Sequence, residues 1–108
     1  KNGFTPDGSP NYTTVWIALT EASTLTSCMY VLPAHADEAY TACSDNVQEE
    51  PVTNFIARSH QHIRALPVCQ GSVLVWSHRL IHWGSASPAY GKRRMALSFA
   101  MAASDFEP

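Results

Sequence analysis

Residues that could bind a metal ion and an acid lie close together in the last third of the chain. His82 follows a run of β-branched and aromatic residues at 73–76 and stands shortly before a turn-rich segment. Arg93 and Arg94 follow that segment. Imidazole binds transition metals, and a guanidinium group binds carboxylates through paired hydrogen bonds. The pattern therefore indicates a metal ligand beside an anion-binding arginine.

The first element needed to hold these residues is a strand that leads to His82. Residues 73–76 predict it, because β-branched and aromatic side chains favour extended backbone and Gly71 precedes them as a breaker. If the strand continues to His82, alternation puts His78 and His82 on one face. Gly84 then marks a turn or a close approach of the backbone to another segment.

A second strand is expected to carry Arg93 and Arg94, whose side chains would point to opposite faces. One face is small and leaves room for a ligand, whereas the other is bulky and suggests packing against another sheet. The small face holds Arg94, Ala96, Ser98 and Ala100, and the bulky face holds Arg93, Met95, Leu97 and Phe99. We therefore choose Arg94 as the anion-binding residue and keep Arg93 as the alternative.

The remaining segments complete an all-β pattern. Residues 12–19 and 28–32 predict two further strands, with Trp16 and Ala18 on one face. The other predicted elements are helical turns at 37–46, a short helix or loop at 52–60 and a frayed tail at 100–108. Strands with long loops and one or two short helices indicate the all-β class, here a partial jelly roll.

Composition bounds the chain and excludes some classes of partner. Its 108 residues suffice for one core, and 45% apolar residues are ordinary for a globular protein. A net charge of −2 gives no basic surface for nucleic acid or anionic membranes, and no apolar run has membrane-spanning length. Cys28, Cys43 and Cys69 lack C-x-x-C spacing and indicate free thiols in a reducing, cytoplasmic compartment.

Four blocks of the sequence carry a family resemblance. They are Val15-Trp-Ile-Ala-Leu-Thr-Glu-Ala22, Cys28-Met-Tyr-Val-Leu-Pro33, Gly71-Ser-Val-Leu-Val-Trp76 with Leu80-Ile-His82-Trp-Gly-Ser85, and Arg94-Met-Ala-Leu-Ser98. In this order they resemble the phytanoyl-CoA dioxygenase family of non-haem iron and 2-oxoglutarate oxygenases. The resemblance extends from about Thr14 to Ala100. It implies a double-stranded β-helix, of which the later strands are present here.

The resemblance also implies a reaction and a set of site residues. The reaction is oxidative decarboxylation of 2-oxoglutarate, coupled to hydroxylation of a small organic substrate at an Fe(II) centre. The implied roles are metal ligand for His82, and contact with 2-oxoglutarate for Trp16, Ser85 and Arg94. The family places glycine directly after the histidine, whereas Trp83 intervenes here. Arg93 therefore stays open as the 2-oxoglutarate-binding arginine.

Two of the three iron ligands are not found in the sequence. Non-haem iron is held by two histidines and a carboxylate, and the family supplies two of them as His-x-Asp before its Trp-x-Ala-Leu strand. Counted back from Trp16, that motif falls at or before Lys1, and Asp7 lies in a Pro-Asp-Gly turn without a histidine. We therefore expect residues 1–108 to be a single domain, the C-terminal part of a larger oxygenase domain that is enzymatic as a whole.

Two alternatives stay open. His60 and His62 form a His-x-His pair, which in an extended segment would point one way, as cupin metal ligands do. A surface loop fits their charged and polar surroundings better. The second alternative is a cupin-like or degenerate jelly-roll module that binds a small ligand without catalysis.

The chain is expected to self-associate, with a twofold homodimer as the first expectation. Half a jelly roll would leave its inner face without a facing sheet and its strand edges with unpaired backbone groups. One such sheet cannot cover all of the bulky residues Trp16, Tyr30, Leu74, Trp76, Leu97 and Phe99. Symmetric pairing with a second copy is the commonest remedy.

Overall fold

The structure, a computed structural model, describes residues 5, 7–42, 53–54, 57, 59–87 and 92–102. Its strands are β1 (Tyr12–Ala18), β2 (Met29–Val31), β3 (Arg64–Leu66), β4 (Val73–Ser77), β5 (His82–Gly84) and β6 (Ala96–Ala102). The short 3-10 helices η1 (Ala34–Ala36) and η2 (His60–His62) and the helix α1 (Glu38–Thr41) lie in the connections. Strands dominate the described residues, as the all-β prediction requires.

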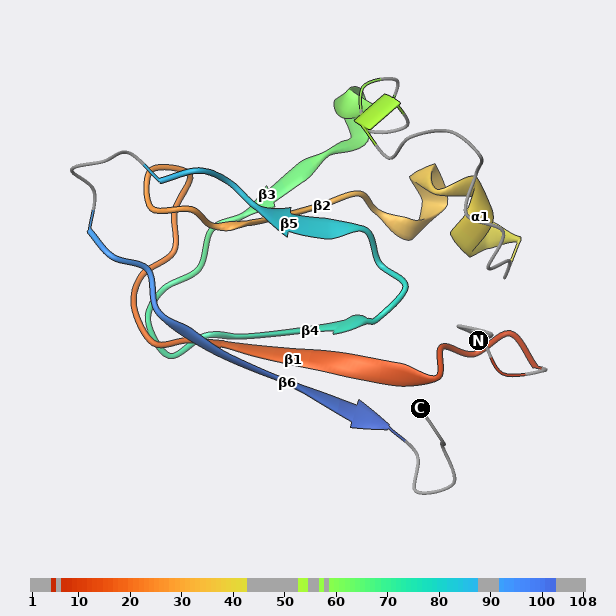
Figure 1. The fold of residues 1–108 in the computed structure, drawn as a ribbon, viewed down its shortest axis with the longest axis horizontal. Helices are drawn as coiled ribbons and strands as arrows, with labels where there is room; N and C mark the ends of the chain where they lie inside the picture. The colour runs from red at the N-terminus through yellow and green to blue at the C-terminus, as the bar shows by residue number, and fades with distance from the viewer. Residues whose placement is uncertain are drawn as a thin grey trace.

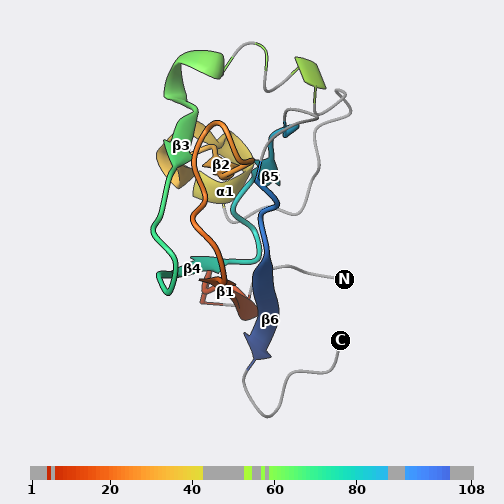
Figure 2. The same cartoon turned by 90° about the vertical axis from the view of Figure 1, so that its left-hand side faces the viewer.

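The strands form two antiparallel three-stranded sheets, in the orders β4-β1-β6 and β3-β2-β5 (Figure 1). The chain crosses from one sheet to the other after β1, β3, β4 and β5. Figure 2 shows the sheets as two separate layers. The all-β prediction is confirmed, whereas the expectation that the inner face lacks a facing sheet is wrong.

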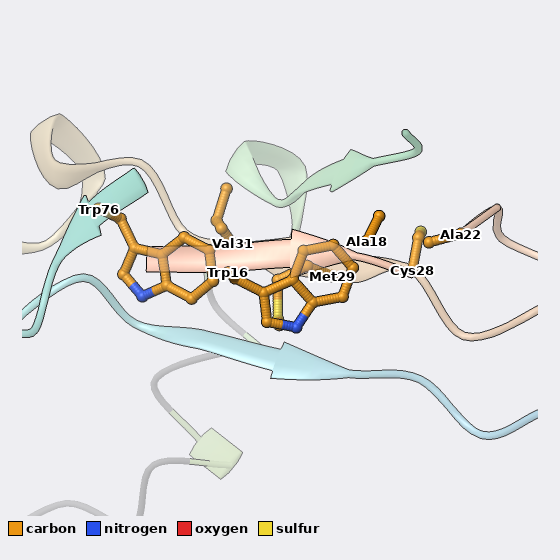
Figure 3. Close-up of a cluster of buried hydrophobic side chains, with 7 residues drawn as sticks. All are labelled: Trp16, Ala18, Ala22, Cys28, Met29, Val31 and Trp76. Atoms are coloured by element: carbon orange, nitrogen blue, oxygen red, sulfur yellow. The ribbon is translucent and has the colours of Figure 1, made fainter. Parts of the chain in front are cut away.

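The central strand β1 sets the inner face of the larger sheet. It pairs with β6 over seven positions, from Tyr12↔Ala102 to Ala18↔Ala96, and with β4 over five. Alternation turns Trp16 and Ala18 inward, and both are buried, as predicted. The buried cluster consists of Trp16, Ala18, Ala22, Cys28, Met29, Val31 and Trp76 (Figure 3). Each tryptophan removes about 150–250 Å² from water, so the two indoles supply much of this core.

The smaller sheet places β5 opposite that core. β2 is its central strand and pairs antiparallel with β5, so that Met29 lies beside Gly84 and Val31 beside His82. Met29 and Val31 are both buried. The positions of His82 and Gly84 therefore belong to the inner face of this sheet, and Trp83 between them belongs to its outer face.

The outer face of the β4-β1-β6 sheet is apolar and exposed. The exposed fraction is 62% for Val75 and 44% for Phe99, the two neighbours of Val15 across the sheet. Val73, Met95, Leu97 and Met101 are also exposed. The prediction that the bulky face of the last strand packs against another sheet is therefore wrong for the described part of the chain. It is the small face, through Ala96, that packs against the buried cluster.

Two strand boundaries differ from the prediction. β4 ends at Ser77, where the Leu80 N–H donates to the Ser77 carbonyl at 3.0 Å and closes a turn. His78 and His82 therefore do not share a strand face. β6 begins at Ala96, after both arginines, and continues to Ala102, so residues 100–102 are strand rather than tail.

The connection after β2 contains the predicted helical turns. Asp37 caps α1, because its carboxylate accepts from the Ala39 and Tyr40 N–H groups at 3.0 and 3.3 Å. Residues 43–46 of the predicted segment lie outside the described residues, and of residues 52–60 helical backbone is described at 53, 54 and 57. No helix in the described ranges is long and apolar enough to cross a membrane.

Candidate acid-binding site between the sheets

His82 opens β5 and turns toward the larger sheet. Its ring centroid lies 5.0 Å from that of the Trp76 indole. Its Nδ1 lies 2.7 Å from the Leu80 carbonyl oxygen, which can only accept, so Nδ1 carries the proton. In the neutral ring Nε2 then keeps its lone pair. A backbone carbonyl that fixes the tautomer in this way is typical of metal-binding histidines.

His78 has a packing role. Its ring stacks on Tyr12 with the centroids 3.9 Å apart, and its Nδ1 lies 3.1 Å from the Tyr12 carbonyl oxygen. These contacts join the turn after β4 to the start of β1. They hold His78 at Tyr12, whereas His82 contacts Trp76.

Arg94 reaches both sheets from the segment just before β6. Its guanidinium carbon lies 5.4 Å from the centroid of the Trp16 ring, which is a cation–π contact. A Cβ placed on Gly84 would lie 3.7 Å from Arg94 Nη2 and 3.4 Å from Ser27 Oγ. Both distances are ordinary van der Waals contacts with side-chain atoms, so neither of the two roles predicted for Gly84 is confirmed, and it lies in β5. Arg93 is exposed, so the two arginines diverge as expected although neither lies in a strand.

Donors without acceptors gather at this place. Within the described ranges no carboxylate forms an ion pair with Arg94. Trp76 Nε1 and Ser85 Oγ are buried and have no hydrogen-bond partner there either. The backbone of Ser85 is fixed by a hydrogen bond, which the Ser27 hydroxyl donates to the Ser85 carbonyl oxygen. A cation and two buried donors without acceptors among the described residues are groups that can bind an anion.

The other candidate metal ligands lie elsewhere. His60 and His62 belong to η2, and residues two apart in a 3-10 helix do not point the same way, so the extended cupin-like pair is not formed. The Asp7 carboxylate accepts hydrogen bonds from Thr5 Oγ1 and from the Ser9 N–H. These contacts, that of Thr5 first, lower the pKa of Asp7 and hold its carboxylate in a turn.

A complete iron site is not assembled by the described residues. No group of three or more histidine, cysteine, aspartate or glutamate side chains lies close enough among them to hold a metal ion. His82 fits one position of such a site, and the remaining positions find no donor in the part of the chain that the structure describes. These residues therefore fit an acid ligand better than they fit the metal.

Trp76 was missed as a site residue by the reasoning from sequence. It was counted only among the bulky residues of the core, and it is 8% exposed. The available signal was its position on the inner face of the strand that leads to His82, together with the single N–H of its indole. A buried donor of this kind asks for a partner, and the sequence offers none beside it.

The described residues thus form two facing antiparallel sheets, with the His82 ring beside Trp76 and the Arg94 guanidinium over Trp16. The family model described as Phytanoyl-CoA dioxygenase (PhyH) matches residues 2–95. The chain belongs to this family, and its domain is of the oxygenase type. No curated protein and no solved structure gives a significant match.

Proposed function

We propose that the chain is the C-terminal part of an Fe(II)- and 2-oxoglutarate-dependent dioxygenase that hydroxylates a small organic substrate. The observation that carries the proposal is a set of donors that find no acceptor among the described residues: the Arg94 guanidinium over the Trp16 ring, Ser85 Oγ and Trp76 Nε1. Membership of the family supports the reaction class.

Within this proposal, Arg94 and Ser85 bind the distal carboxylate of 2-oxoglutarate. Trp16 lies beneath the guanidinium and holds it by its ring face. Arg94 is half-buried, and partial burial strengthens a charge-assisted hydrogen bond. Arg93 is the alternative binding residue, and its exposure makes it the weaker candidate.

His82 is the residue of this chain that we assign to iron. Its Nε2 is available while Nδ1 is bonded to Leu80. Fe(II) belongs to the larger oxygenase domain that we propose, because the described residues supply one ligand where the family needs three. The free thiols of Cys28 and Cys69 support a reducing, cytoplasmic location. The net charge of −2 supports partners other than nucleic acid and membranes.

The experiment is a calorimetric titration of 2-oxoglutarate into the unsubstituted chain, Arg94→Ala and Arg93→Ala. Loss of a charge-assisted contact in a partly buried site costs roughly 2–5 kcal/mol, so Arg94→Ala is expected to raise Kd about 30-fold or more. Arg93→Ala is the matched control and is expected to change Kd less than about threefold. A larger effect at Arg93 would reject the assignment of Arg94.

The second candidate is a jelly-roll module that binds an acid without catalysis. The single metal ligand among the described residues favours it. Turnover of 2-oxoglutarate to succinate by the larger oxygenase domain, abolished by His82→Ala, would reject this candidate. Binding of the acid without turnover would support it.

A further inference from the structure

We infer that Trp76 is a ligand-binding residue of this site, and that its indole Nε1–H donates a hydrogen bond to an oxygen of the bound acid beside His82. This inference rests on the proposed function, because it requires an acid between the sheets. It adds a donor at the opposite end of the site from Arg94.

The first observation is the state of the indole nitrogen. Trp76 is 8% exposed, and its Nε1 is buried without a hydrogen-bond partner among the described residues. Buried tryptophan N–H groups usually find an acceptor, because an unpaired donor in a low-dielectric interior is unfavourable. An acceptor supplied by a ligand would remove this penalty when the ligand binds.

The second observation is the position of Trp76 along the sheet. In the pairing of β1 with β4, Trp76 lies opposite Thr14, whereas Trp16 lies opposite Leu74. Two steps along a strand cover about 7 Å, so the two indoles lie at different places along the inner face. In Figure 3 the two indole nitrogens lie on the same side of the row of buried residues.

The third observation is what stands beside each indole. The Arg94 guanidinium lies over Trp16, and the His82 ring lies 5.0 Å from that of Trp76. A short acid along β1 would meet a cation at one end, and at the other an N–H donor beside the imidazole. The acid class is therefore one with oxygens at both ends, and an acid with a single carboxylate would lose one of the two contacts.

The test separates donation from packing. Trp76→Phe keeps an aromatic ring but removes the N–H together with the five-membered ring, and Trp83→Phe, which removes the same atoms, is the matched control. Trp83 stacks on Tyr30 at 6.1 Å between centroids and belongs to the outer face of the smaller sheet. The readouts are Kd for 2-oxoglutarate by calorimetry and Tm of the free protein by circular dichroism.

For Trp76→Phe we expect Kd to rise about tenfold, because the donor to the ligand is lost. Tm is expected to fall as well, because the smaller ring leaves a cavity in the core. For Trp83→Phe we expect an unchanged Kd. Leu74→Ala is the control for packing, because Leu74 lies on the same inner face and has no donor in its side chain; we expect it to lower Tm and leave Kd unchanged. An unchanged Kd in Trp76→Phe would overturn the inference, and so would a rise of the same size in Leu74→Ala, since that result assigns Trp76 to packing.

The same titrations distinguish this inference from the proposed function. Binding that depends on Arg94 but ignores Trp76→Phe overturns the inference alone. Absence of 2-oxoglutarate binding to the unsubstituted chain overturns both.

Discussion

The two faces of the β4-β1-β6 sheet come from the same three strands and differ in what covers them. On the inner face, Trp16 and Trp76 are 4% and 8% exposed, and the second sheet lies over them. On the outer face, Val75 and Phe99 are 62% and 44% exposed, and no described element covers them. The inner face carries the free Trp76 donor, whereas the outer face is mostly apolar. We therefore expect ligand binding at the inner face and association at the outer face.

This comparison predicts its largest effect at the centre of the inner face. Trp16→Ala should lower the free energy of unfolding by about 3–5 kcal/mol, because it leaves a large cavity between the sheets. Val75→Ala on the outer face is the control and should change it by less than about 1 kcal/mol. Urea unfolding at a protein concentration low enough to keep the chain monomeric measures both. Similar decreases in the free energy of unfolding for the two variants would mean that the two faces are equally buried.

The outer face is expected to bind a second copy of the chain. Large apolar side chains lie next to one another on this face and are exposed, namely Val73, Val75, Leu97, Phe99 and Met101. Contiguous exposed apolar patches mark protein–protein interfaces. Light scattering behind a sizing column should therefore give twice the mass of one chain.

A charged residue at the centre of this face should abolish the association. Phe99→Lys places a charge opposite Val15, and it is expected to give a monomer. Leu25→Lys is the control, because Leu25 is 72% exposed but lies outside the strands. If the unsubstituted chain ran as a single species near the mass of one chain, self-association through the outer face would be contradicted.

The strands were predictable where local pattern decides them. β1 and β4 combine β-branched and aromatic residues with a clear inward set, and both were predicted within a residue or two. The turn after Ser77 was not predicted, because the residue types beyond Ser77 still favour extended backbone. A single backbone hydrogen bond between Leu80 and Ser77 ends the strand there. That turn separates His78 from His82.

Which face of the sheet is covered by another element could not be predicted from the alternation of side chains. Alternation divides β6 into a small and a bulky face, but which of them meets another sheet depends on the crossing connections. The resemblance assigned Arg94 and Trp16 to the same ligand; the structure shows a contact between them, and their binding roles stay predictions. The donor role of Trp76 requires knowledge of its burial and of its missing partner, neither of which a single strand reveals.

The most direct test of an acid site between the sheets is an NMR titration that follows the indole N–H signals of the three tryptophans. Trp16 and Trp76 line the inner face, and Trp83 lies on the outer face of the other sheet. As 2-oxoglutarate is added, the signals of Trp16 and Trp76 should shift and saturate together, while that of Trp83 stays in place. Unchanged signals from Trp16 and Trp76, or a larger shift at Trp83, would contradict the site.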